Sequence, residues 1–423
     1  MRPFLALTCV STLALFAACA PTGEVRSTAE PAPVAAGTPA IAGLVAPETA
    51  PDPGTDRGTY AGAVRRGVVT AGDIDDQRNL AAFTRYLAGA RLGLPQLGLG
   101  KPVLVSLMGP TGKSAPGVRY TLRKPGAAEP FHEGYSGPGG EIVDFPQVLG
   151  AGALDRVEIR TFNANGQELR RNMVRTGKPA MIALQNDLTW QPDFLDLVLV
   201  VDTTGSMGDE IAFLQRELIG VIRAAARKAP GVSIRYGLVA YRDQGDDYVV
   251  KTYGFTGDSA TMAGWLRGLS AGGGGDYPEA AAAALQVGVG LDWRAGKGER
   301  LVLHVADAPP HAGDADDYLR AAKAAAGKGV QIFTLGASGV AAESEFLMRQ
   351  AAVATGGRYL FLTDDSGVGN AHAEPTIPCY RVTQLSKLLT RVLMTELSGQ
   401  RQEATSGEVI REAGSYSAGV CRN

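Results

Sequence analysis

Three polar segments, each placed just after an apolar run, hold residue types that could bind a cation. The first is D-T-T-G-S-M at 202–207, after the run L-D-L-V-L-V-V. The second is the glycine-rich G-G-G-G-D-Y-P-E at 272–279, and the third is V-A-D-A-P-P-H, in which Asp307 ends an apolar stretch. Carboxylate and hydroxyl oxygens are the ligands that hard divalent cations prefer. The three segments therefore predict a cation site if the fold brings them together.

The pattern from residue 195 onward predicts a sheet that would do so. Continuous apolar runs alternate with stretches of helical periodicity, such as 210–228, where Ile211, Leu214, Leu218 and Ile222 recur on one face. This alternation is typical of an α/β fold, so we expect a doubly wound, mostly parallel sheet over 195–400. Ligands of such sheets bind beyond the carboxyl ends of the strands. All three polar segments should lie there.

The string D-x-T-x-S after the first strand resembles the D-x-S-x-S motif of von Willebrand factor A domains and integrin inserted domains. In that family the aspartate and two hydroxyls hold a divalent cation, with a threonine from a second loop and an aspartate from the fourth strand. The resemblance implies that Asp202, Thr204, Ser206 and Asp307 are metal ligands. It implies Mg²⁺, with Ca²⁺ or Mn²⁺ as alternatives, and a protein partner whose own carboxylate completes the metal shell.

The second loop departs from the family pattern because it offers no threonine. Asp276 follows the glycine run, and we expect it to replace the threonine as a ligand. Loops of the form G-G-G-D-x-P-E in other A domains look similar. A carboxylate suits the same hard cations, but it neutralises more of the metal's charge. We therefore expect a partner carboxylate to bind less favourably here.

A further acidic turn, Y-R-D-Q-G-D-D at 241–247, should lie near the same end of the sheet. Asp243, Asp246 and Asp247 either form an acidic rim that favours basic partners or belong to an ordinary solvated turn. His304 lies inside an apolar strand, so we expect a buried core histidine.

The amino-terminal residues predict export. Residues 1–18 form a short basic start and an apolar stretch ending in F-A-A-C, which resembles a lipoprotein signal peptide with Cys19 as the lipidated residue. The alternative is an ordinary secretory signal. Residues 19–58, rich in Pro and Ala, predict a disordered tether. We therefore expect a lipid-anchored protein of the bacterial cell envelope, and Ala20 favours the outer membrane.

Three other segments complete the domain prediction. Residues 59–95 predict a helical lead-in capped by Asp75 or Asp76. Residues 96–190 predict a small β-sandwich with a hairpin turn at Asn165-Gly166, similar to transthyretin-like or carboxypeptidase-regulatory-like modules. Residues 401–423 form a carboxy-terminal tail. In an oxidising compartment the remaining cysteines, Cys379 and Cys421, either form a disulfide or stay as two free thiols.

Composition and motifs exclude several functions. A net charge of -2 without a long basic run argues against nucleic acid. The string G-P-T-G-K-S at 109–114 lacks the first glycine of a phosphate-binding loop, so no nucleotide is expected. No H-E-x-x-H or G-x-S-x-G occurs, and no catalytic residue is predicted. The sequence favours binding of a protein through a cation over a scaffold with a structural metal or a metal-dependent hydrolase.

Overall fold

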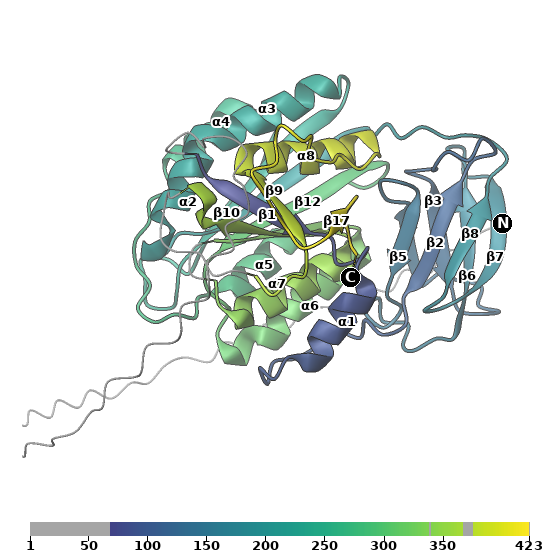
Figure 1. Ribbon diagram of the computed structural model, residues 1–423, viewed down its shortest axis with the longest axis horizontal. Coiled ribbons are helices and arrows are strands. Elements are labelled where there is room, and N and C mark those ends of the chain that lie inside the picture. The colour runs from purple at the N-terminus through teal and green to yellow at the C-terminus, as the bar shows by residue number, and fades with distance from the viewer. Residues whose placement is uncertain (1–67, 338–339, 367–374, 423) are drawn as a thin grey trace, which may run out of the picture. The chain divides into compact units, whose positions relative to one another are not determined.

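The computed structural model describes residues 68–337, 340–366 and 375–422. Residues 1–67, which include the expected signal peptide, Cys19 and the tether, lie outside the described residues. The described chain contains a nine-stranded sheet with helices on both faces and a β-sandwich, which is inserted in the sequence between the first strand of that sheet and the others (Figure 1). The expected α/β class is confirmed.

The strand order of the large sheet is β11-β10-β9-β12-β13-β14-β1-β15-β16. The five strands from β10 to β14 in this order are parallel, and the remaining four pair antiparallel. The strands span β1 Thr70–Ile74, β9 Phe194–Asp202, β10 Ser233–Tyr241, β11 Val250–Thr256, β12 Gly298–Ala306, β13 Gln331–Gly336, β14 Tyr359–Thr363, β15 Tyr380–Gln384 and β16 Arg411–Ala413.

Helices cover both faces of this sheet. In Figure 1, α3, α4 and α8 lie on one side, and α5, α6 and α7 on the other. All nine residues of β9 are buried, as expected for a strand between two helical layers. The helices span α1 Leu80–Gly89, α2 Gly208–Phe213, α3 Ile219–Lys228, α4 Ser259–Arg267, α5 Ala281–Gly290, α6 Ala315–Lys328, α7 Ala342–Thr355 and α8 Leu385–Ser398. A π-helical turn, Leu214–Leu218, joins α2 to α3.

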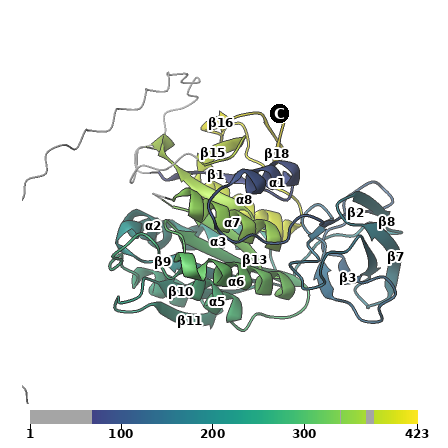
Figure 2. The same ribbon diagram turned by 90° about the horizontal axis from the view of Figure 1, so that it is seen from below.

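The segment 59–95 is not a separate helical lead-in, as far as it is described. Its residues Thr70–Ile74 form β1, which pairs antiparallel with both β14 and β15 inside the large sheet. Figure 2 shows β1 and β15 beside α1 at one end of the sheet. The cap prediction is also wrong, because α1 follows Asn79 and Asp76 instead accepts hydrogen bonds from Arg349 at 2.8 and 2.9 Å.

The carboxy-terminal residues are likewise part of the α/β domain. Strand β16 pairs with β15, and a short hairpin follows, β17 Tyr416–Ser417 and β18 Val420–Cys421. Cys379 and Cys421 form a disulfide, which decides between the two alternatives. The backbone N–H of Cys421 donates to Asn79 Oδ1 at 2.9 Å. The tail is therefore fixed to the start of α1.

The β-sandwich packs a three-stranded sheet, β5-β2-β8, against a four-stranded sheet, β4-β3-β6-β7. Its strands span β2 Val103–Met108, β3 Arg119–Arg123, β4 His132–Tyr135, β5 Glu141–Asp144, β6 Arg156–Phe162, β7 Glu168–Arg175 and β8 Pro179–Ala183. Gly166 has φ +79° in the turn between β6 and β7, where the sequence predicted a hairpin. Within the described ranges, no helix is long and apolar enough to cross a membrane.

Candidate metal centre

Asp202, the last residue of β9, forms the centre of the candidate site. Its Oδ1 accepts hydrogen bonds from the backbone N–H of Thr204 at 2.9 Å and from the Thr204 hydroxyl at 2.7 Å. Its Oδ2 is buried and accepts no hydrogen bond of ordinary length from the described residues. Burial, and next the charge of Asp307, raise the pKa of Asp202 to about 7, against the opposing effect of Thr204 and the Tyr241 hydroxyl.

Asp307 follows β12, the strand beside β9, and so reaches the same edge. It is 4% exposed, and its Oδ1 has no hydrogen-bond donor within the described part of the chain. Burial raises the pKa of Asp307, and an interaction with the Ser206 hydroxyl opposes this rise. Hydroxyls that direct their protons at carboxylates keep lone pairs available. Thr204 and Ser206 therefore remain possible ligands.

The glycine-rich loop is held directly against the first segment. The N–H of Gly205 donates to the carbonyl of Gly273 at 3.2 Å, and the N–H of Gly272 donates to the carbonyl of Thr203 at 3.1 Å. Gly273 and Gly274 have φ of +76° and +74°, a region that favours glycine. A Cβ on Gly273 would lie within 2.5 Å of the Asp246 carboxylate. Only glycine lets this loop approach so closely.

Glu279, which the sequence analysis missed, supplies the third buried carboxylate of the site. It is 4% exposed, and a Cβ on Gly274 would lie 3.0 Å from its Oε1 and 3.3 Å from the Cβ of Thr204. Burial raises the pKa of Glu279 to about 8, and the charges of Asp202, Asp243 and other nearby aspartates add to this. Its Oε2 has no hydrogen-bond donor in the described ranges.

Asp276 lies apart from this group. Its side chain is exposed, and its charge acts on His311. The largest contributions to the pKa shifts of Asp202, Asp307 and Glu279 come from other groups. The structure thus buries the Glu279 carboxylate near Asp202 and leaves the Asp276 carboxylate exposed, so Asp276 as a ligand stays a prediction. The sequence signal for Glu279 was its place two residues before the start of α5 and three residues after Asp276.

The acidic turn after β10 is structured, not a simple solvated turn. Asp246 Oδ2 accepts from the N–H groups of Asp243 at 3.0 Å and Gly274 at 2.8 Å, so it ties this turn to the glycine-rich loop. Asp243 is 5% exposed, and its Oδ1 lies 2.7 Å from His311 Nε2. Asp247 is exposed, 3.5 Å from the Arg242 guanidinium. Asp243 and Asp246 thus help to build the loop.

His304 is buried in β12, as expected. Its two ring nitrogens lie 3.2 Å from the Tyr241 hydroxyl and 3.0 Å from the Tyr318 hydroxyl. Burial lowers the pKa of His304 to about 3, so the ring is neutral at physiological pH. His304 contacts Tyr241 and Tyr318 in the core, and we assign it no role as an acid or base.

The three carboxylates fit a hard divalent cation by their chemistry. Each has a buried oxygen without a donor among the described residues, and each has a raised pKa, because burial and, after it, the charges of nearby carboxylates disfavour ionisation. In the described residues, no three His, Cys, Asp or Glu side chains are already arranged to hold a metal. A cation here would therefore depend on the hydroxyls of Thr204 and Ser206 as well as on the carboxylates.

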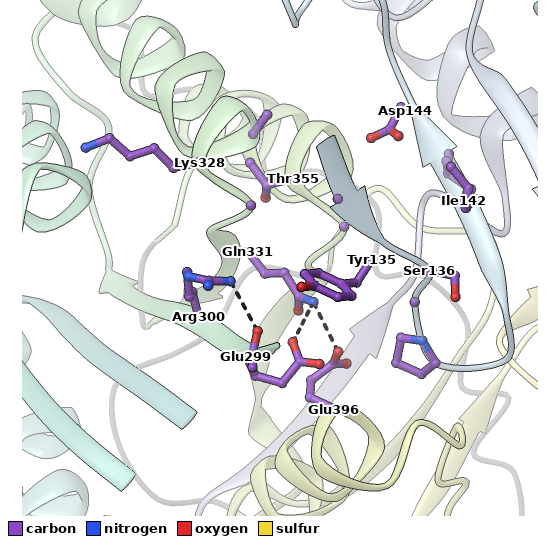
Figure 3. A pocket seen from close by; sticks show the side chains of 18 of the residues that line it. Tyr135, Ser136, Ile142, Asp144, Glu299, Arg300, Lys328, Gln331, Thr355 and Glu396 are labelled. Carbon is purple, nitrogen blue, oxygen red and sulfur yellow. Dashed lines mark hydrogen bonds between the residues drawn. The ribbon is translucent and has the colours of Figure 1, made fainter. Parts of the chain in front are cut away.

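A separate cavity of about 560 Å³ lies away from these carboxylates, beside the amino-terminal ends of β12 and β13. Figure 3 shows Glu299 and Glu396 side by side at its wall, with the Gln331 amide donating to both, at 3.4 and 3.2 Å. Burial raises the pKa of Glu299 well above its usual range and that of Glu396 to about 7. The two glutamates can lie this close because the Gln331 amide donates to both and because their raised pKa values favour the uncharged, protonated form.

Known proteins resemble the part of the chain that carries the site. The family model for the von Willebrand factor A domain matches residues 196–364. An ariadne-like RING finger protein of Acanthamoeba polyphaga mimivirus is 32% identical over 117 residues, which cover 28% of this chain and 11% of that protein. The alpha-protein kinase vwkA of Dictyostelium discoideum is 29% identical over 118 residues, 28% of this chain and 19% of the kinase. The matches thus span less than a fifth of these relatives.

Among solved structures, BatB from Bacteroides thetaiotaomicron aligns at 17% identity and a TM-score of 0.33, covering 42% of this chain and 91% of BatB. The family match covers the strands from β9 to β14 and all three site loops. Residues 196–364 of this chain therefore carry a von Willebrand factor A domain.

Proposed function

We propose that this protein binds a protein partner through a divalent cation held by Asp202, Thr204, Ser206 and Asp307, with Glu279 beside them. The observation that carries the proposal is the group of buried carboxylate oxygens without donors at the carboxyl ends of neighbouring strands. Mg²⁺ is the expected ion, because the donors are all oxygens and the loops are rigidly tied. Asp276, exposed at the rim, would act on partner charge and not as a ligand.

The partner would present a carboxylate to the ion, because a hard divalent cation takes oxygen ligands. The match of residues 196–364 to the von Willebrand factor A domain supports an interaction role. The proposed location is the bacterial envelope, with Cys19 as lipid anchor. We propose no hydrolytic activity.

The first test is calorimetry with Mg²⁺ and with Ca²⁺ on the full-length protein. We expect one saturable site in the wild type and none in Asp202→Ala. Asp209→Ala is the matched control, because Asp209 is an exposed aspartate on α2, seven positions further along the chain. An equal heat of binding in the wild type, Asp202→Ala and Asp209→Ala would show that Asp202 holds no metal and would refute the proposed site.

The second test concerns the partner. Envelope proteins cross-linked to the wild type are compared with and without chelator, and with Ser206→Ala as bait. We expect a specific adduct that disappears in both cases. An adduct that survives the chelator would leave the metal with a purely structural role. Metabolic labelling with a fatty acid, in wild type and Cys19→Ser, tests the anchor independently.

A further inference from the structure

The outer face of the sheet β4-β3-β6-β7 collects positive charge although the whole chain has a net charge of -2. Side chains alternate between the two faces of a strand. Val157, Ile159 and Val174 point into the sandwich core, so their neighbours in β6 and β7 point outward. The charged residues of the outer face are three glutamates, Glu133, Glu158 and Glu168, and six arginines, Arg119, Arg123, Arg156, Arg160, Arg171 and Arg175.

The register of β6 and β7 places arginines directly opposite each other twice. Arg156 faces Arg175, and Arg160 faces Arg171. Like charges at directly opposed positions destabilise a sheet. The stability of the sheet therefore does not explain why arginines occupy these opposed positions.

The glutamates of this face reduce the charge repulsion only between Arg160 and Arg171. Glu158 and Glu168 lie within 4 Å of Arg160, and Glu168 also binds Arg171 at 3.0 Å. Arg156 and Arg175 are both exposed, and no carboxylate of the described residues forms an ion pair with either. Arg156 and Arg175, which are directly opposed in the register, thus lack a neutralising carboxylate among the described residues.

The shape of the face argues for a planar partner. Strands lie about 4.8 Å apart and alternate residues about 6.6 Å apart, so the arginines form a two-dimensional array and not a groove. Guanidinium groups bind phosphate oxygens in bidentate fashion. Between the arginines stands Met173, an apolar side chain that is 47% exposed and lies opposite Glu158.

We propose that this outer face binds the phosphate-bearing surface of an anionic bilayer, with Arg156 and Arg175 as the main contacts and Met173 entering the headgroup layer. The proposal is independent of the metal site, and it gives the protein a membrane contact besides any lipid anchor. It would hold the sandwich against the membrane and leave the metal site on the other domain free.

The test uses the full chain carrying Cys19→Ser in every variant, so that no attached lipid contributes. Vesicles of phosphatidylcholine alone are compared with equimolar phosphatidylcholine and phosphatidylglycerol by co-sedimentation. The ratio of the two affinities cancels any contribution of the apolar amino-terminal segment. We expect the double variant Arg156→Gln/Arg175→Gln to lower this ratio about 25-fold, or about fivefold for each arginine. The preference should also vanish at about 1 M salt, where the Debye length is about 3 Å.

The matched control is Arg227→Gln/Lys228→Gln, which removes the same charge from two exposed residues at the end of α3. We expect it to keep the ratio within about twofold, since charges beyond a Debye length are screened. An equal loss in both double variants, or equal binding to both vesicle types, would overturn the proposal. So would a soluble polyglutamate that displaces the protein from anionic vesicles at equal charge, because an acidic protein surface would then be the better partner.

Discussion

The charge of Asp202 should destabilise the protein whenever no cation is bound. Its pKa is raised from 3.8 to about 7 in the folded state. The folded protein therefore binds the proton more tightly than the unfolded chain does. This stabilises the fold below about pH 4, and the contribution is lost as the pH rises through about 7. The substitution that tests this is Asp202→Asn, which removes the charge and keeps the shape.

The expected size follows from the structure. A pKa difference between 3.8 and about 7 corresponds to about 4 kcal/mol, at about 1.36 kcal/mol per pH unit. The asparagine oxygen can still accept from Thr204, but its NH₂ group replaces an oxygen that has no donor and finds no acceptor. An unpaired buried donor costs about 1–3 kcal/mol. We therefore expect Asp202→Asn to raise the free energy of unfolding by about 1–3 kcal/mol at alkaline pH without metal.

The assay is urea unfolding in chelator at about pH 5 and about pH 8, on either side of the folded-state pKa. Asp209→Asn is the control, because this aspartate is exposed on α2. Saturating Mg²⁺ should reverse the order at the higher pH, because at a thousandfold excess over Kd it stabilises the wild type by about 4.1 kcal/mol and leaves Asp202→Asn unchanged. If Asp202→Asn were less stable than wild type at both pH values in chelator, the electrostatic reasoning would be refuted.

Three other predictions follow from the same structure. Glu279→Gln should weaken Mg²⁺ binding at least about tenfold in calorimetry, whereas Asp276→Asn, an exposed change, should alter it by no more than about twofold; the reverse ranking would restore Asp276 as the ligand. Burial lowers the pKa of His304 to about 3, so the free energy of unfolding should fall as the pH drops below about 6.5. His304→Phe should reduce the slope of this free energy against pH by about 1.4 kcal/mol per pH unit. An unchanged slope would contradict a neutral buried ring. The Cys379–Cys421 disulfide spans 42 residues, so Cys379→Ser/Cys421→Ser should cost about 4 kcal/mol in urea unfolding; reductant should destabilise the wild type alone.

The sequence predicted the parts of the fold whose local pattern is strong. The run that becomes β9 is buried on both faces, so it contains almost only apolar residues. D-T-T-G-S-M follows it directly, and the strand-to-helix context made Asp202, Thr204 and Ser206 recognisable. Asp307 was found for the same reason.

The missed elements depend on tertiary contacts that leave little local pattern. Strand β1 is five residues long and includes Gly72, where a Cβ would lie 2.6 Å from the Phe361 ring. A glycine in so short a segment argues locally against a strand, and the close approach of the Phe361 ring from the neighbouring strand β14 explains why glycine is there. Strand β15 adjoins α8 without a break, so no turn residue in the sequence marks where the strand ends and the helix begins. Glu279 owes its role to burial, which the sequence does not show.

The place of β1 in the sheet has a mechanical consequence. A pull on the chain just before Thr70 would enter a strand that pairs over five residues with β14 and over two with β15. These hydrogen bonds would be loaded in shear, together with the core beneath them. The β-sandwich comes later in the chain and would carry none of this load. A protein tethered by its amino-terminal segment and pulled by a partner at the metal site would bear the force through one sheet.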